Sequence, residues 1–358
     1  MPQLEVLEHA EVYRNPHPNT TSEYVAFPSI LALPSGTLLC QCRHGSARES
    51  DDGIVKIHRS TDGGRTWTPG GELPREDAPG FYLPGGFGLT PDNGTIAWLR
   101  YPSGPVTVRS NDEGLSWSEP EAISEGAYPG QGPGGNLVLC TDGTLIAAAE
   151  WGEKNHTGPH PDWAALTARS KDGGRTWDTW QKAHGPQDGV YYFDLRIAGL
   201  ADDRLLAAYW THDMAKDQGL NVHTATSSDQ GQTWTQPRDA GFWGQVTSVA
   251  GLQSDRVIAV TNHRRPPYGV RALLSDDGGE TFDEQNHLEL WGIEPATVRN
   301  APVLAKRRDR VENALEAYHF FTFGTPTVTQ VPDGTIVIAF YVTEEHVTYV
   351  RCCRLREV

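Results

Sequence analysis

The chain has little of several things that mark other classes of protein. Its 358 residues include 2 Met and 5 Cys, and no two cysteines have the C-x-x-C spacing of a zinc or redox motif. We therefore expect reduced thiols, no metal site and no cofactor. The N-terminal residues Met1–Val6 lack the basic and apolar segments of a signal peptide. The expected location is cytoplasmic, although a secreted chain trimmed of its signal peptide would look the same.

Positive charge is also scarce. Lys and Arg number 30 against 46 Asp and Glu, so the formal net charge is −16. An acidic surface of this kind repels nucleic acid and anionic membranes, and no apolar run is long enough to span a bilayer. We expect neither as a partner. An anionic ligand would need a local group of basic side chains.

Turn-forming and aromatic residues are abundant, with 38 Gly, 25 Pro and 11 Trp, which suits many short strands joined by tight turns. One motif, Ser-x-Asp-x-Gly-x-Thr/Ser-Trp/Phe, occurs five times. Its copies begin at Ser60, Ser110, Ser170, Ser227 and Ser275. The Ser and Asp side chains can bind nearby backbone N–H groups, the Gly can take positive φ, and the aromatic ring can pack under the turn. These residues are expected to be structural.

A second repeat consists of two short apolar strands around a tight turn, which is a hairpin pattern. Its six copies span residues 28–43, 86–100, 135–150, 194–210, 247–262 and 326–341. Repeats of this length predict an all-β, six-bladed β-propeller of four-stranded antiparallel blades, forming one domain over residues 1–358. The alternating segment Glu5–Val12 is predicted to complete the last blade. Residues 283–318 are the least blade-like, and Lys306–Ala317 could form a short charged helix.

The five motifs resemble those of the Asp-box, or BNR-repeat, proteins. That family includes sialidases, other glycoside hydrolases, polysaccharide lyases and non-catalytic binding proteins. In sialidases the first blade opens with Phe-Arg-Ile-Pro, and its Arg grips the substrate carboxylate; the similar segment Val25–Pro28 has Ala26 at that position. The nucleophilic tyrosine of the family would fall at or near Thr325. The resemblance therefore implies a divergent sialidase-like carbohydrate enzyme.

A ligand of a propeller is expected near the central axis. Two positions in each blade approach it, namely the start of the innermost strand and the exit from the second strand. Several second strands lead directly from apolar residues into charged ones. The candidate substrate-binding residues are Arg43, Arg100, Arg264, His212, His263 and Trp243. The three arginines, from three blades, could converge on an anionic group, and Trp243 could stack on a sugar ring. On this hypothesis Arg43→Ala should weaken binding without altering thermal stability.

Glycoside hydrolysis usually needs two carboxyl groups. The best candidates are Glu150 and Asp194, with Asp51 as a third. Tyr192 is the candidate if a tyrosine acts as nucleophile, as in sialidases, and it should share a sheet face with Asp194. The predicted function is a glycoside hydrolase acting on an acidic or polar sugar.

Two alternatives remain open. One is a lyase acting on uronic-acid glycans, in which His44, His212 or His263 would remove the proton. The other is a non-catalytic propeller that binds sugar or protein. The oligomeric state is not predicted.

Overall fold

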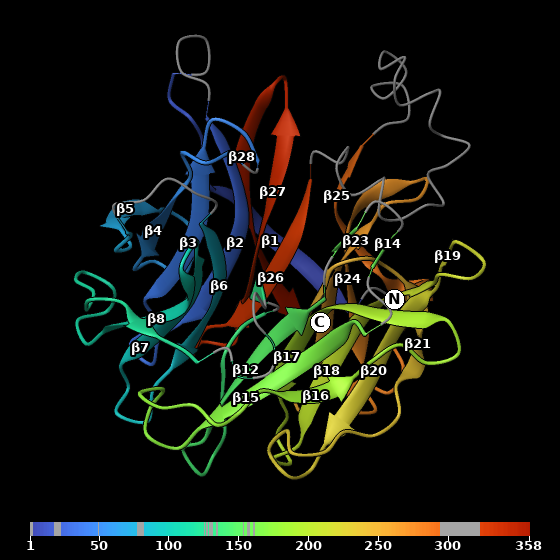
Figure 1. The fold of residues 1–358 in the computed structure, drawn as a ribbon. Helices are drawn as coiled ribbons and strands as arrows, with labels where there is room; N and C mark the ends of the chain where they lie inside the picture. The colour runs from blue at the N-terminus through green and yellow to red at the C-terminus, as the bar shows by residue number, and fades with distance from the viewer. Residues whose placement is uncertain are drawn as a thin grey trace.

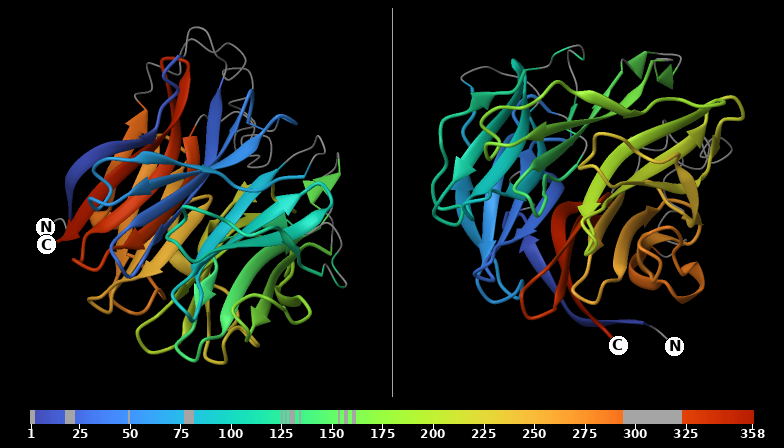
Figure 2. Two further views of the ribbon diagram at one scale, coloured as in Figure 1. Left: turned by 90° about the vertical axis from the view of Figure 1, so that its left-hand side faces the viewer. Right: turned by 90° about the horizontal axis from the view of Figure 1, so that it is seen from below.

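The computed structural model describes residues 3–17, 23–48, 50–76, 82–124, 126, 128, 132–133, 135–152, 154–155, 158–159, 162–293 and 323–358. These residues form six antiparallel sheets arranged as blades around a central axis (Figures 1 and 2). The predicted six-bladed β-propeller is confirmed. The described part of the chain contains a single 3₁₀ turn, Glu284–Asn286, and no helix long and apolar enough to cross a membrane.

The first three blades follow each other along the chain. Blade 1 contains β2 (Tyr24–Ala32), β3 (Leu38–Gly45), β4 (Ile54–Ser60) and β5 (Thr68–Glu72). Blade 2 contains β6 (Leu83–Leu89), β7 (Thr95–Tyr101), β8 (Gly104–Ser110) and β9 (Glu121–Ala122). Blade 3 contains β10 (Gly132–Pro133), β11 (Val138–Leu139), β12 (Leu145–Trp151), β15 (Ala164–Ser170) and β16 (Gln181–His184). A separate small hairpin pairs β13 (Lys154–Asn155) with β14 (Gly158–Pro159).

The remaining blades complete the ring. Blade 4 contains β17 (Val190–Gly199), β18 (Leu205–Asp213), β20 (Asn221–Ser227) and β21 (Arg238–Trp243), with β19 (Gln218–Gly219) beside β18. Blade 5 contains β22 (Thr247–Gly251), β23 (Val257–His263), β24 (Tyr268–Ser275) and β25 (Leu288–Ile293). The closing blade contains β26 (Phe323–Gln330), β27 (Ile336–Glu344), β28 (Val347–Glu357) and β1 (Leu4–Tyr13). The helix predicted at Lys306–Ala317 lies outside the described residues.

The two ends of the chain close the ring together. β1 pairs antiparallel with β28, from Leu4 opposite Glu357 to Tyr13 opposite Val350, and the termini lie side by side (Figure 2). This confirms that the N-terminal segment completes the last blade. The pairing covers the outer edge of β28, which would otherwise present unpaired backbone groups to solvent.

Removing residues 1–13 is therefore expected to lower stability and to cause concentration-dependent association, because β28 becomes an exposed sheet edge. Size-exclusion chromatography with light scattering measures the association. Removal of residues 1–3 leaves β1 intact and serves as the control. A truncated chain that stays monomeric and equally stable would show that β1 is dispensable.

Six clusters of buried apolar side chains fill the spaces between neighbouring blades, and each draws on two adjacent sheets. The short apolar strands of the hairpin repeat supply most of these residues, including Leu38, Ile96, Leu145 and Ile258, which are all fully buried. Burial on both faces explains why these strands read as continuous apolar runs. The core thus lies between blades.

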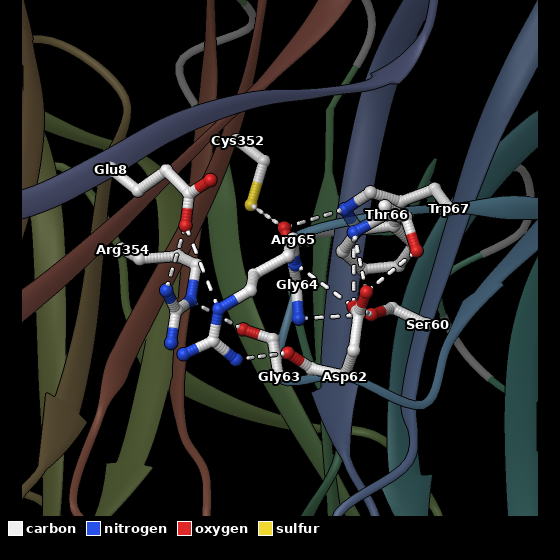
Figure 3. A network of polar contacts seen from close by, with 10 residues as sticks. All are labelled: Glu8, Ser60, Asp62, Gly63, Gly64, Arg65, Thr66, Trp67, Cys352 and Arg354. Carbon is white, nitrogen blue, oxygen red and sulfur yellow. Dashed lines mark hydrogen bonds and ion pairs between the residues drawn. The ribbon is translucent and has the colours of Figure 1, made fainter.

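The Asp boxes lock the turns after the third strand of five blades. In the first box, Ser60 Oγ donates to Asp62 Oδ1 (2.8 Å) and accepts from the Gly64 N–H (2.9 Å). Asp62 also accepts from the N–H and the hydroxyl of Thr66, at 3.0 and 2.6 Å, and Trp67 Nε1 donates to Gly64 O (Figure 3). Corresponding bonds of the Ser and Asp side chains recur in the other four boxes.

Each box also accepts a hydrogen bond from the third strand of the preceding blade. In the first box, Arg354 Nε on β28 donates to Gly63 O at 2.7 Å, while Arg354 Nη1 lies 3.0 Å from Glu8 Oε2 (Figure 3). The donors to the next four boxes are Arg59, Arg109, Thr167 and Thr224, whose acceptors are carbonyls of Glu113, Gly174, Gly231 and Gly279. The repeat therefore holds both its own turn and the neighbouring blade.

This bonding makes stability depend on acid pH. Hydrogen bonds from Ser116 lower the pKa of Asp112 to about 2. For Asp62 and Asp172, burial would raise the pKa, but hydrogen bonds from Thr66 and Thr176 outweigh it and the pKa also falls to about 2.

An unfolded Asp has a pKa of about 3.9, so these groups contribute stability that is complete above that value and is lost as the pH falls toward about 2. Urea unfolding across this pH range should show a falling free energy of unfolding. In Asp112→Asn the fall should be smaller. An unchanged free energy across the range would contradict this role.

Candidate functional site

The innermost strands of all six blades line one polar pocket on the axis, which we call the axial pocket. Its lining residues are Phe27, Pro28, Ser29, Leu83, Pro84, Gly85, Gly135, Asn136, Asp194, Arg196, Ser248, Thr325, Pro326 and Thr327. Farther along the same strands, a second hollow is lined mainly by apolar side chains such as Leu31, Leu89 and Leu139. Polar groups are thus concentrated at one level of the axis.

Bulges in the innermost strands account for the polar side chains at this level of the axis. The register shifts lie between Ala26 and Ser29, Pro84 and Phe87, Phe193 and Arg196, and Gly324 and Thr327. In three of them a non-glycine residue has positive φ, namely Phe27 (55°), Asp194 (52°) and Thr325 (43°). A bulge turns side chains out of the regular alternation and often lies next to a functional site. Here the bulges direct polar residues toward the axis.

Glu150 and Asp194, predicted as the carboxylate pair, are brought together from neighbouring blades. The backbone N–H of Asp194 donates a hydrogen bond to Glu150 Oε1. Asp194 Oδ1 lies 3.8 Å from Arg196 Nη2, and the two side chains are 22% and 15% exposed. Asp194 and Arg196 line the axial pocket. Glu150 therefore contacts the backbone of Asp194, and Arg196 lies near its side chain.

Tyr192 does not share the position of Asp194, because the bulge after Phe193 breaks the alternation. Its ring is buried against His184, Tyr209 and His223. Burial and the nearby Asp188 raise the pKa of Tyr192. Its ring belongs to the core between blades 3 and 4.

The residues at the two sialidase positions have different surroundings. Ala26 is 1% exposed and packs in the core between blade 1 and the closing blade. Thr325 lines the axial pocket, and its Oγ1 has no hydrogen-bond partner among the described residues. The amide atoms of the fully buried Asn262 are likewise unpaired within the described part of the chain.

Two of the three arginines predicted to converge on an anion, Arg43 and Arg264, donate to backbone carbonyls instead. Arg43 is fully buried, and its guanidinium donates to the carbonyls of Tyr82 (3.1 Å), Ala47 (2.9 Å), Arg48 (3.0 Å) and Ser50. It thereby holds the loop between β3 and β4 and the start of blade 2. None of this involves the axial pocket.

Arg264 likewise donates to a backbone carbonyl, at the junction between blade 5 and the closing blade. Its Nη2 donates to Phe323 O (2.7 Å) and its Nη1 to Gln245 Oε1 (3.1 Å). Gly324 is positioned so that a β-carbon would meet the Arg264 guanidinium, which explains the absence of a side chain there. Arg100 is half-buried near the end of β7 and is not among the pocket residues.

Three predicted residues lie at or near the ends of strands in blades 4 and 5. They are Trp243 on β21, His212 on β18 and His263 on β23. The Trp243 ring lies 5.3 Å from that of His263, nearly perpendicular to it, and the Arg265 guanidinium covers Trp243 at 4.2 Å. His212 is fully buried, with Nε2 3.2 Å from Asp217 Oδ1. Burial lowers the pKa of both histidines. The structure thus places Trp243 and His263 close to each other. Neither of them lines the axial pocket.

The last two candidates belong to blade 1. Asp51 is exposed in the turn between β3 and β4. His44 is buried, with Nδ1 2.7 Å from Glu23 Oε1 and Nε2 3.2 Å from His58 Nε2. Burial lowers the pKa of His44, and it lowers the pKa of His58 to about 3. Neither Asp51 nor His44 lines the axial pocket.

Several pocket residues escaped prediction, above all Ser29, Asn136, Ser248 and Thr327. One pattern in the sequence could have located these residues. Pro or Gly interrupts an apolar strand at 28, 84–86, 133–135 and 326, and such residues inside strands mark bulges and close backbone approaches. Gly86 is an example, since a β-carbon there would overlap the backbone of Asn136 in the next blade.

Comparisons with known proteins agree with this architecture. A family model described as BNR repeat-like domain matches residues 90–338. A sialidase of Bacteroides fragilis is 24% identical in an alignment 321 residues long, which covers 74% of this chain and 56% of the relative, so the chain spans little more than half of that protein.

Two solved structures share the fold along the whole chain. A protein of unknown function from Dyadobacter fermentans has a TM-score of 0.75 at 17% identity and covers 100% of both chains. An α-L-arabinanase of Penicillium chrysogenum in complex with arabinobiose has a TM-score of 0.65 at 14% identity and covers 98% of both. The chain therefore has the same fold as these two proteins. Because the family model matches well over half of the residues, this chain belongs to the BNR repeat-like domain family.

Proposed function

We propose that the protein is a glycoside hydrolase that acts on a polar sugar bound in the axial pocket. The observation that carries the proposal is the position of Asp194, which lines the axial pocket at a bulge and is contacted by Glu150 through its backbone N–H and by Arg196 at its side chain. Two carboxyl groups near one glycosidic bond are the usual equipment for its hydrolysis. The strained backbone of Asp194, with φ of 52°, is typical of functional positions.

In this mechanism Asp194 is the carboxylate that acts at the anomeric centre, because its side chain faces the pocket. It serves either as nucleophile or as the base that activates water. Glu150 donates the proton to the leaving oxygen. Arg196 Nη2 lies 3.8 Å from Asp194 Oδ1, close enough to orient that carboxylate.

The lining supports a polar substrate over a strongly acidic one. Arg196 is the only basic residue among the described residues that line the pocket, and it already faces Asp194. Ser29, Asn136 and Ser248 supply groups that can hydrogen-bond sugar hydroxyls. An α-L-arabinanase is among the proteins of this fold, and a sialidase is a distant relative. Arabinosides are therefore the first substrates to test, and sialosides are tested beside them because of the distant relative.

The experiment measures release of new reducing ends from a panel of arabinan, sialylated and uronic-acid glycans. Hydrolysis predicts new reducing ends from at least one of them. An absorbing unsaturated uronate product would instead identify a lyase. Saturable binding with no product at any enzyme loading would identify a binding protein. Either of the last two results would overturn the proposal.

A further inference from the structure

A second group of chemically active side chains lies in blade 1. Cys42, His44 and His58, which we call the Cys-His cluster, are all buried. Their Sγ and Nε2 atoms lie within 4.8 Å of one another. Cys42 Sγ is 3.4 Å from His44 Nε2, and the two Nε2 atoms are 3.2 Å apart. The three donor atoms thus point to a common centre.

The strand geometry accounts for this convergence. Cys42 and His44 are two residues apart on β3, so their side chains leave the same face of the sheet. His58 lies on the adjacent β4, opposite Cys40 and two residues from Lys56, which is opposite Cys42. The sequence spacing gives no metal motif, because the ligands come together through strand pairing.

A carboxylate and a tyrosine support the cluster from behind. Glu23 Oε1 lies 2.7 Å from His44 Nδ1, and Tyr13 Oη donates to Glu23 Oε2 at 2.7 Å. A carboxylate that binds Nδ1 fixes the imidazole tautomer and leaves the Nε2 lone pair for a metal. The Cys-His cluster therefore has the outer shell that ligating histidines commonly have.

The separations between the donor atoms match those around a tetrahedrally coordinated metal ion. Zinc bonds of about 2.0–2.1 Å to nitrogen and about 2.3 Å to sulfur place two ligand nitrogens roughly 3.3 Å apart and nitrogen and sulfur roughly 3.6 Å apart. The observed separations of 3.2 and 3.4 Å are close to these values.

We propose that Cys42, His44 and His58 bind one zinc ion as its three protein ligands. Cys42 binds as thiolate, and its proton is released to solvent. The ion would tie β3 to β4 and, through Glu23 and Tyr13, to the end of β1 in the closing blade. This proposal is independent of the hydrolase activity, since none of the three ligands lines the axial pocket.

The test uses the full chain, freed of metal with a chelator and titrated with Zn²⁺ or Co²⁺ alone. We expect one ion per chain, a higher melting temperature with Zn²⁺, and a thiolate-to-cobalt charge-transfer band with Co²⁺ that Zn²⁺ displaces. Cys42→Ser should abolish the band, and His58→Gln should weaken binding by about 100-fold or more. Glu23→Gln should weaken it by about 10–100-fold, as expected for an outer-shell partner.

Two thiols provide matched controls. Cys140 is half-buried outside the cluster, and Cys353 Sγ lies 3.1 Å from His9 Nδ1, so Cys353 is a second example of a thiol beside an imidazole. Cys140→Ser and Cys353→Ser should keep the band and the affinity. Absence of the band in the unmodified protein would overturn the proposal, and so would a band that survives Cys42→Ser. The measurement on the unmodified protein does not depend on whether a variant folds.

Discussion

Asp194→Asn is expected to reduce kcat/KM by about 10²–10⁴-fold, which corresponds to roughly 3–5 kcal/mol of transition-state stabilisation. The amide has nearly the shape of the carboxylate but cannot attack the anomeric carbon or take a proton from water. Asn tolerates positive φ as readily as Asp, so the backbone at 52° should be kept. The N–H that binds Glu150 also stays in place. We therefore expect an almost unchanged melting temperature.

Asp203→Asn is the matched control. Asp203 also has positive φ (63°) and belongs to the same blade, but it is exposed in the β17–β18 turn at the end remote from the exits of the second strands. It should leave both activity and stability unchanged. Kinetics on whichever glycan of the panel is hydrolysed, together with thermal unfolding, measure both effects. Full activity in Asp194→Asn would remove this residue from the mechanism.

Arg43→Ala is expected to lower the free energy of unfolding by about 3 kcal/mol, since the buried carbonyl of Tyr82 loses its donor and the part-buried carbonyls of the β3–β4 loop lose theirs. The substitution takes the donor from the carbonyls of Ala47, Arg48, Ser50 and Tyr82 at once. It also leaves a cavity beside Gly53, whose Cα packs against the guanidinium. Equilibrium urea unfolding measures the loss.

The structure reverses the expectation drawn from sequence, which was weaker ligand binding at unchanged stability. Arg238→Ala, at an exposed position in blade 4, controls for removing a positive charge and should be nearly neutral. If Arg43→Ala stays as stable as the parent while losing sugar binding, the guanidinium contacts the ligand after all. A clear loss of stability supports the structural role.

A common physical role explains why charged residues recur at the exits of the second strands. In several blades this residue binds the backbone of the innermost strand of the next blade, or of the residue just before it. The three pairs are Arg43 with Tyr82 O, Glu150 with Asp194 N–H, and Arg264 with Phe323 O. Buried backbone groups at blade junctions need partners, and long polar side chains can reach them. Only Glu150 among these three also meets a pocket residue.

The pattern of residues determined the architecture of this protein. Asp boxes and hairpin repeats are local signals, since their bonds join residues two to four apart, as between Ser60 and Gly64 or Asp62 and Thr66. Six repeats could therefore be counted as six blades, and the alternating Glu5–Val12 segment could be assigned to the closing blade. The sequence also pointed to Glu150 and Asp194 as a pair, although it placed Tyr192 beside them.

Tertiary structure alone decided which polar residues meet, because these contacts join blades or neighbouring strands. Bulges broke the alternation that would have put Tyr192 beside Asp194, and they turned Asp194 to the axis. The guanidinium of Arg43 donates to backbone carbonyls of the adjacent blade and of the β3–β4 loop. Strand pairing brought Cys42 and His58 together despite their spacing. Each outcome depends on long-range geometry, which local residue patterns do not specify.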